Sequence, residues 1–179
     1  MAGKVIYTAE AHVVGGRTDG HGRTSDGVLE VDLRLPGTDE AGTNPEQLFA
    51  VGYAACFEGA LGAIARREKV ELGKVNIDSE VDLKTTEDRA FEVGVRLNVN
   101  LPDISDPEQA KMIVAAAHQV CPYSRATRGN IDVELSANGE PVDRGSGRKG
   151  PGDHGDQSRS ACPRSGNRQC DRYTGRVGR

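Results

Sequence analysis

The sequence predicts an α+β fold in which an antiparallel sheet packs around one central, buried helix. Three observations predict it. Several segments alternate apolar and polar residues with a period of two, which is typical of strands that have one face in water. Two segments break this alternation and begin with helix-capping patterns, and the first of the two is apolar on nearly every side. The resulting order of strand, strand, helix, strand, strand, helix, strand is that of a layered α+β domain.

Five candidate strands follow from the alternation. They lie at residues 5–7, 29–35, 75–83, 91–101 and 131–135. The second shows the pattern most plainly, because apolar and charged residues alternate along it in the order Leu29, Glu30, Val31, Asp32, Leu33, Arg34, Leu35. Since each candidate has one polar face, we expect an antiparallel sheet with one side exposed to solvent.

Two helices are predicted, at residues 45–69 and 107–121, because each begins with the same signals. Asn44 and Asp106 take the N-cap position, a proline follows at the first helical position, and a glutamine stands three residues after each cap. The first helix carries small residues on the face centred on Cys56, so another backbone can approach there. A sheet of this size covers only one side of a helix that is apolar all round. We therefore expect a second copy of the chain to cover the other side.

The overall composition excludes several classes of protein. The chain has 179 residues, with 23 Lys and Arg against 27 Asp and Glu, so no general positive field would attract nucleic acid or an anionic membrane. The longest uncharged runs, at residues 47–57 and 112–124, are shorter than the roughly 18 apolar residues of a membrane span. The first ten residues contain no readable secretory signal, which predicts a cytoplasmic protein with reduced cysteines.

The composition changes near residue 143, which predicts a domain at residues 1–142 and a disordered, Gly- and Arg-rich tail at residues 143–179. The tail holds nine basic and four acidic side chains, eight glycines and too few apolar residues to bury a core. Its arginines are dispersed, which argues against a basic arm for nucleic acid, and readthrough sequence after the domain is a further interpretation. Cys162 and Cys170 lie in this tail, and we assign them no function.

The domain has two cysteines, Cys56 in the middle of the first helix and Cys121 at the end of the second. Neither belongs to a CxxC motif. Each residue alone is most simply a small buried hydrophobic residue. A zinc site with His118 is a second interpretation, but the sequence offers one HxxC spacing and no second ligand pair.

Three motifs together resemble a known family. They are GGR at residues 15–17, NPEQLFA at 44–50 running into GYAACF at 52–57, and CPYS at 121–124 followed by ATRGNIDV at 126–133. In this order and spacing they are similar to the organic hydroperoxide resistance (Ohr) family within the OsmC-like superfamily. The resemblance covers about residues 5–135 and leaves the tail outside.

The resemblance implies a thiol-dependent peroxidase, an oxidoreductase that reduces organic and lipid hydroperoxides to alcohols in defence against oxidative stress. By the same resemblance, Cys56 matches the peroxidatic cysteine, Cys121 the resolving cysteine, and Arg17 and Glu46 the ion pair that activates the site. It also implies an intertwined homodimer with the active site at or near its interface, and a lipoylated protein or other dithiol as reductant. We expect no cofactor, no metal, no nucleic acid and no membrane partner. Two alternatives remain: a redox-sensing or binding relative without turnover, and a structural relative with inert cysteines.

The chemistry of a thiolate agrees with these roles. An apolar helix interior raises the pKa of a cysteine, so Cys56 needs a cation, and Arg17 beside its glycine turn suits this better than Arg23. A buried arginine needs a carboxylate, which Glu46 offers. On a straight helix, however, ten residues separate Glu46 from Cys56 by about 15 Å. Either Arg17 spans this gap or Glu46 comes from the partner subunit, and we favour the partner as a hypothesis.

A resolving role for Cys121 requires the fold to bring two distant positions together. The Cα atoms of Cys56 and Cys121 must approach to within roughly 7 Å before a disulfide can form between them. We assign no substrate contact to the aromatic residues of the first helix, which are ordinary core residues by pattern.

Overall fold

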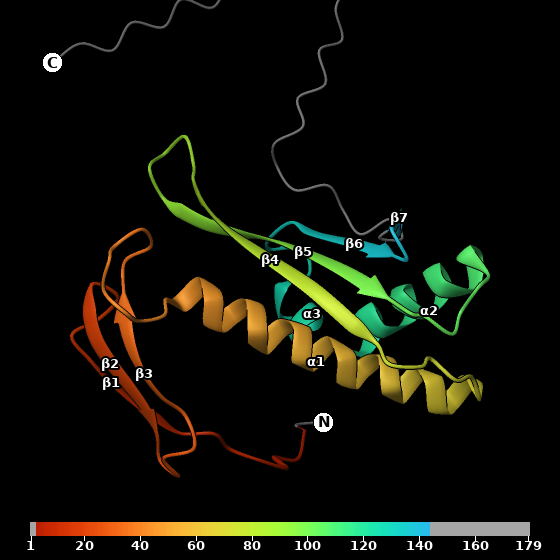
Figure 1. Cartoon of the computed structure of the whole chain (residues 1–179), viewed down its shortest axis with the longest axis horizontal. Helices are drawn as coiled ribbons and strands as arrows, with labels where there is room; N and C mark the ends of the chain where they lie inside the picture. The colour runs from red at the N-terminus through yellow and green to blue at the C-terminus, as the bar shows by residue number, and fades with distance from the viewer. Residues whose placement is uncertain (1–2, 144–179) are drawn as a thin grey trace, which may run out of the picture.

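The computed structural model describes residues 3–143 and shows two sheets joined by one long helix (Figure 1). Apart from its first residue, the tail predicted at 143–179 lies outside the described residues, as do Cys162 and Cys170. The fold is a mixed α+β arrangement, which confirms the predicted class.

The N-terminal sheet contains β1 (Ala11–Val14), β2 (Asp19–Thr24) and β3 (Glu30–Arg34), all antiparallel, in the order β1-β2-β3. The turn between β1 and β2 contains Gly15 and Gly16, with φ angles of 72° and 66°. Glycine suits both positions, because left-handed backbone is costly for residues with a Cβ atom.

The C-terminal sheet contains β4 (Asn76–Thr85), β5 (Phe91–Asn100), β6 (Val133–Ala137) and β7 (Glu140–Pro141), in the order β4-β5-β6-β7. The first two form a long antiparallel hairpin, and β7 pairs antiparallel with β6. The pair β5 and β6 is parallel, because the helical segment between them carries the chain back across the sheet.

Three helices complete the described chain: α1 (Pro45–Glu68), α2 (Pro107–Val120) and α3 (Pro122–Thr127). The caps of the two longer helices are those that the sequence predicts. The side chain of Asn44 accepts a hydrogen bond from the backbone N–H of Gln47, and that of Asp106 accepts one from Glu108.

The hydrophobic core lies between α1, α2 and the C-terminal sheet. Its fully buried members include Tyr53, Phe57 and Leu61 of α1 and Leu97 of β5. The other side of α1 is uncovered by residues 3–143: Val51, in the second turn of the helix, is 71% exposed. Figure 1 shows the N-terminal sheet standing apart from the core, near the N-terminal end of α1.

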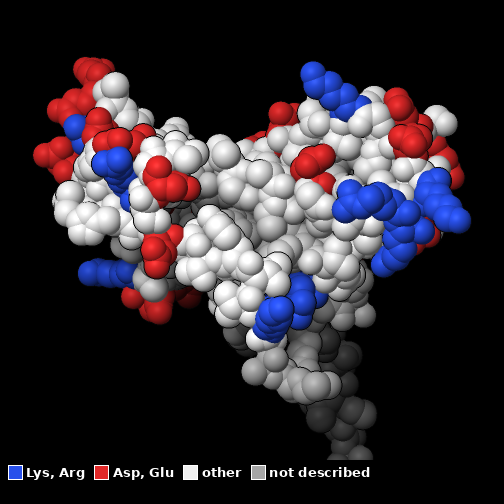
Figure 2. Space-filling view, turned by 90° about the horizontal axis from the view of Figure 1, so that it is seen from below, with Lys and Arg blue, Asp and Glu red and all other residues white. Residues whose placement is uncertain are grey.

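Among the described helices, α1 alone is long and apolar enough to cross a membrane by length and composition. Its most apolar stretch has a mean hydropathy of 1.6, and 28% of that stretch is buried in the chain. The central helix of a water-soluble protein passes the same test. Figure 2 shows the molecule from the side of α1, where the middle of the surface carries few charges and Lys, Arg, Asp and Glu gather toward two ends.

The structure corrects four predictions made from the sequence. Residues 5–7 form no strand, since nothing pairs with them and Ile6 is 95% exposed. The strand β2 went unpredicted because its glycines interrupt any apolar alternation. The structure has two sheets rather than one, and one of its strand pairs is parallel. Alternation indicates only that one face of a strand is exposed to solvent, and it gives neither the direction of a strand nor its pairing partner. The short α3 follows Pro122 directly, where the second helix was expected simply to end.

Candidate functional site

The fold brings the two cysteines of the domain together. Cys56 lies half-buried on α1, and Cys121 is fully buried in the one-residue junction between α2 and α3. The thiol of Cys121 donates to Cys56, and the two Sγ atoms are 3.7 Å apart. Both thiols are free, and their distance allows a disulfide to form after a small movement.

The surroundings of Cys56 within one chain favour the neutral thiol. Burial is the main cause that raises its pKa, and the neighbouring Cys121 raises it further. A hydrogen bond from the backbone of Tyr123 acts in the opposite direction and stabilises the thiolate. In the described part of the chain, no lysine or arginine contributes to the pKa of Cys56. The cysteine pair alone is therefore not activated as a nucleophile at neutral pH.

A second pair of predicted residues meets at the start of α1. Arg17, on the turn between β1 and β2, donates from Nη2 to both carboxylate oxygens of Glu46, each at 2.6 Å. The side chain of Glu46 is 15% exposed and that of Arg17 is 40% exposed. The glycine turn thus carries a cation to a carboxylate in the first turn of the helix, where a negative charge is also favoured by the helix dipole.

The four predicted residues therefore form two pairs, each assembled within one chain. Glu46 and Cys56 lie ten residues apart on α1, which corresponds to about 15 Å along a helix axis. Arg17 bonds to Glu46 of its own chain, so the ion pair is complete within one chain. The hypothesis that Glu46 joins the site of Cys56 from the partner subunit stays a prediction.

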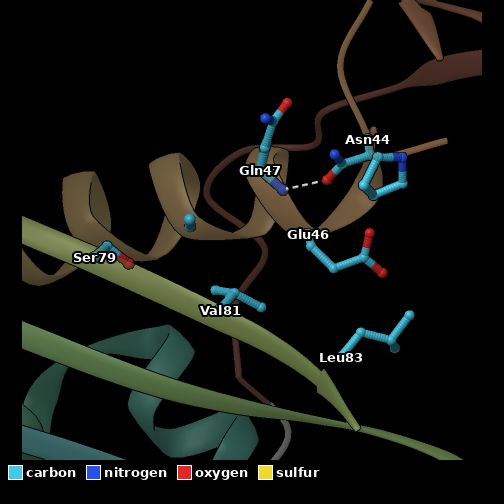
Figure 3. Close-up of a pocket in the computed structure, with 8 residues that line it drawn as sticks. Asn44, Glu46, Gln47, Ser79, Val81 and Leu83 are labelled. Carbon is cyan, nitrogen blue, oxygen red and sulfur yellow. Dashed lines mark hydrogen bonds between the residues drawn. The ribbon is translucent and has the colours of Figure 1, made fainter. Parts of the chain in front are cut away.

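A pocket of about 330 Å³ opens beside the ion pair, between the first turns of α1 and strand β4 (Figure 3). Its lining is mostly apolar with a few polar groups: Pro36, Asn44, Glu46, Gln47, Ala50, Ser79, Val81 and Leu83. Figure 3 shows the side chains of Val81 and Leu83 of β4 facing Glu46 of α1. The ion pair thus borders a space that an apolar group can enter.

Sequence reasoning missed a group of buried hydroxyls beside Cys121. The hydroxyl of Tyr53 on α1 donates to Oγ of Ser124 at 3.0 Å and lies 3.2 Å from Oγ1 of Thr127, both on α3. Tyr53 and Ser124 are fully buried. The only sequence signal was a tyrosine in a helix otherwise apolar, since a buried phenol needs a partner for its hydroxyl.

No group of three His, Cys, Asp or Glu side chains with the geometry of a metal site occurs within residues 3–143.

Comparison with known proteins identifies the family of this arrangement. The model of the OsmC-like protein family matches residues 37–136. The organic hydroperoxide resistance protein OhrB of Bacillus subtilis is 47% identical over 138 residues, which are 73% of this chain and 96% of that protein. The chain belongs to the OsmC-like family, in its organic hydroperoxide resistance (Ohr) group.

Further Ohr relatives agree with this assignment. The organic hydroperoxide resistance protein of Xanthomonas axonopodis pv. citri is 48% identical over 138 residues, covering 74% of this chain and 95% of the relative. The crystal structure of OhrB of Bacillus subtilis superposes with a TM-score of 0.70, covering 74% of this chain and 98% of that structure. The resemblance predicted from the three motifs, and the fold that it implied, are confirmed.

Proposed function

We propose that this Ohr protein is a thiol peroxidase that reduces organic hydroperoxides to alcohols. The observation that carries the proposal is the approach of the two free thiols, 3.7 Å apart, with one half-buried and the other fully buried. The Cys56 thiolate attacks the terminal oxygen of the hydroperoxide, the O–O bond breaks, and a proton goes to the departing alkoxide. The products are the alcohol and a sulfenic acid on Cys56.

Cys121 is the resolving cysteine in this proposal. Its sulfur attacks the sulfur of the sulfenic acid, so that the Cys56–Cys121 disulfide forms and the hydroxyl leaves as water with the thiol proton. The burial of Cys121 supports this division of roles, because an incoming hydroperoxide meets the more accessible Cys56 first. A dithiol then reduces the disulfide to two thiols, and a lipoylated protein is the reductant that the family resemblance suggests.

Activation of Cys56 needs a cation that residues 3–143 of its own chain do not supply, and we assign this role to the Arg17–Glu46 pair of a partner subunit. A guanidinium keeps its charge and stabilises both a thiolate and the peroxide oxygens. Glu46 holds the guanidinium in place through both of its carboxylate oxygens. If the α1 helices of two chains run antiparallel about a two-fold axis near Val51, midway between Glu46 and Cys56, the start of one helix lies beside Cys56 of the other.

Three features of the single chain support such a homodimer. The side of α1 that bears Val51 is apolar and uncovered. The N-terminal sheet stands apart from the core of its own chain (Figure 1). The outer strand β4 also leaves a sheet edge that a partner strand can pair with, whereas the edge of β3 bonds to Thr43 of its own chain. An intertwined dimer covers all three features at once.

The same site also supports a substrate class and a cellular location. An apolar pocket next to a cation suits the alkyl chain and the peroxide group of an organic hydroperoxide. The relatives are named for resistance to organic hydroperoxides, which supports this substrate class and a role in defence against oxidative stress. We place the protein in the cytoplasm, where a dithiol reductant keeps the cycle running.

The experiment is a peptide-level thiol count after one equivalent of an alkyl hydroperoxide, followed by addition of dihydrolipoamide. We expect the wild type to lose the thiols of Cys56 and Cys121 together and to turn over with the dithiol. Cys121→Ser should stop at a sulfenic acid on Cys56, and Cys56→Ser should not react. Cys162 and Cys170 serve as internal controls, since we expect both to keep their thiols.

Each other outcome contradicts part of the proposal. If Cys56 reacts no faster than Cys162 and Cys170, the protein is not a peroxidase. If the disulfide forms but the dithiol does not restore turnover, the protein is a redox sensor, in which the disulfide changes a binding surface.

A further inference from the structure

The position of Cys121 depends in part on α3, a helix that is too short to be stable without contacts to the rest of the protein. Cys121 is the residue immediately before α3, and its side chain makes no capping hydrogen bond to that helix. With six residues, α3 gains little stability from its own backbone hydrogen bonds. The backbone N–H of Cys121 bonds to the carbonyl of Ala117 and so caps α2, while its own carbonyl accepts from Arg125 of α3. The place of Cys121 is therefore set from two sides, by α2 and by the contacts that α3 makes with the rest of the protein.

One polar contact between α3 and α1 goes through the side chain of Tyr53. Its hydroxyl bonds to Oγ of Ser124 at 3.0 Å and lies 3.2 Å from Oγ1 of Thr127, which in turn donates to the backbone oxygen of Tyr123 at 2.9 Å. Tyr53 and Ser124 are fully buried and Thr127 is 9% exposed. Burial raises the pKa of Tyr53, so its hydroxyl keeps its proton and remains a donor across the physiological range.

The same turn of α1 that holds α3 also carries the reacting sulfur. Tyr53 precedes Cys56 by three residues, so both side chains point to nearly the same side of the helix. Cys56 meets the Cys121 thiol and receives a hydrogen bond from the backbone of Tyr123, while Tyr53 meets the next turn of the same segment. One rigid stretch of α1 thus fixes both the target sulfur and the segment that carries the attacking sulfur.

We infer that Tyr53 is a positioning residue for the resolving step, whose hydroxyl holds Ser124 and Thr127 so that the Cys121 sulfur stays within reach of oxidised Cys56. This inference rests on the proposed peroxidase function. In the step concerned, the sulfenic acid of Cys56 and the thiol of Cys121 give a disulfide and one molecule of water. The two sulfurs must close from 3.7 Å to about 2.05 Å, and a misplaced α3 lengthens that path.

The resolving step competes with a second oxidation. A sulfenic acid that is not captured by Cys121 reacts with another hydroperoxide, which transfers an oxygen atom to give a sulfinic acid and a second alcohol. The ratio of disulfide to sulfinic acid on Cys56 therefore measures how well Cys121 is positioned. A purely structural role for Tyr53 would lower the melting temperature and leave this ratio unchanged.

The test is Tyr53→Phe, which removes one hydroxyl oxygen and keeps the ring in the core. We expect sulfenic acid to form at the wild-type rate, disulfide formation to slow about tenfold, and sulfinic acid to build up at hydroperoxide concentrations that the wild type tolerates. Quenched-flow sampling with mass spectrometry of the Cys56 peptide measures all three species. Tyr7→Phe is the matched control: it removes the same hydroxyl from a tyrosine that is 77% exposed and lies ahead of β1, outside the site, so the ratio should stay at the wild-type value.

A second pair of variants separates positioning from folding. Thr127→Ser keeps a hydroxyl at the network and should retain the wild-type ratio, whereas Thr127→Val removes it and should shift the ratio toward sulfinic acid. A wild-type ratio in both Tyr53→Phe and Thr127→Val overturns the inference and leaves the peroxidase proposal standing. Absence of any oxidation of Cys56 in the wild type, whether as sulfenic acid, disulfide or sulfinic acid, overturns the peroxidase proposal itself.

Discussion

At the scale of single residues, the buried environment of Cys56 opposes the thiolate form that its proposed role requires. The burial of Cys56 raises its pKa, yet a peroxidatic cysteine must be a thiolate. The backbone of Tyr123 supplies one hydrogen bond that favours the thiolate, and a full positive charge is still needed. The sequence already indicated this need, because an apolar helix interior is readable from the pattern around Cys56. It could not indicate where the charge lies, since that depends on how chains associate.

The first prediction concerns the charge on Arg17. Arg17→Gln should raise the pH midpoint of Cys56 alkylation by at least about one unit, because the cation favours the thiolate and its loss leaves the effect of burial unopposed. Rates of iodoacetamide labelling of the Cys56 peptide, measured against pH in a Cys121→Ser background, give the midpoint.

Arg23→Gln is the matched control for this prediction. Arg23 lies on β2, shortly after the turn that carries Arg17. Its Nε is 3.9 Å from Glu30 and its side chain is 60% exposed, so its loss should leave the pH midpoint of Cys56 alkylation unchanged. An unchanged midpoint in Arg17→Gln would show that another group activates Cys56.

At the scale of elements, the sequence was most informative where signals are local. The starts of α1 and α2 depend on a cap and a proline within four residues, and both helices begin where these residues predict. Strand β2 was missed because its glycines interrupt the apolar alternation. The parallel pair of β5 and β6 was not foreseen because it joins residues that are distant in the sequence. The motifs named Arg17 and Glu46 through family resemblance, but their contact became visible only with the turn between β1 and β2 in place.

That turn is the basis of the second prediction. A Cβ atom on Gly20 would lie far inside contact distance of the carbonyl oxygen of Gly16, and 2.8 Å from that of Val14. Gly20→Ala must therefore shift the turn that carries Arg17, and it should lower peroxidase turnover about as much as Arg17→Gln while the Cys56–Cys121 disulfide still forms. Steady-state assays and thermal unfolding of both variants measure the two effects separately.

Gly22→Ala provides the comparison on the same strand. A Cβ atom there would meet side-chain atoms of Val13 and Val31 at 3.5 and 3.6 Å, which is ordinary packing distance. Its turnover should equal that of the wild type. Full turnover in Gly20→Ala would mean that the position of Arg17 does not limit the reaction.

At the scale of the whole molecule, one chain holds two halves of a site that it cannot join by itself. The thiol pair lies in the middle of α1, and the ion pair lies at its start, about 15 Å away along the axis. The sequence anticipated a dimer from the all-round apolar character of α1, and the exposed Val51 shows where the chain leaves that helix uncovered. In the dimer that we propose, the partner brings Glu46 to the site of Cys56, as expected from the sequence, and brings Arg17 with it.

The last prediction tests this division with mixed dimers of inactive chains. Cys56→Ser keeps the ion pair and lacks the nucleophile, and Glu46→Ala keeps the nucleophile and lacks the support of Arg17. If the site is shared, a heterodimer of the two contains one intact site and one site with both defects. Random reassociation of equal amounts makes half of the dimers mixed, so turnover should return to about one quarter of the wild-type value. Neither variant reassociated with itself should recover, and a mixture that stays inactive while mass spectrometry shows mixed dimers would place the ion pair and the cysteines of each site in the same chain.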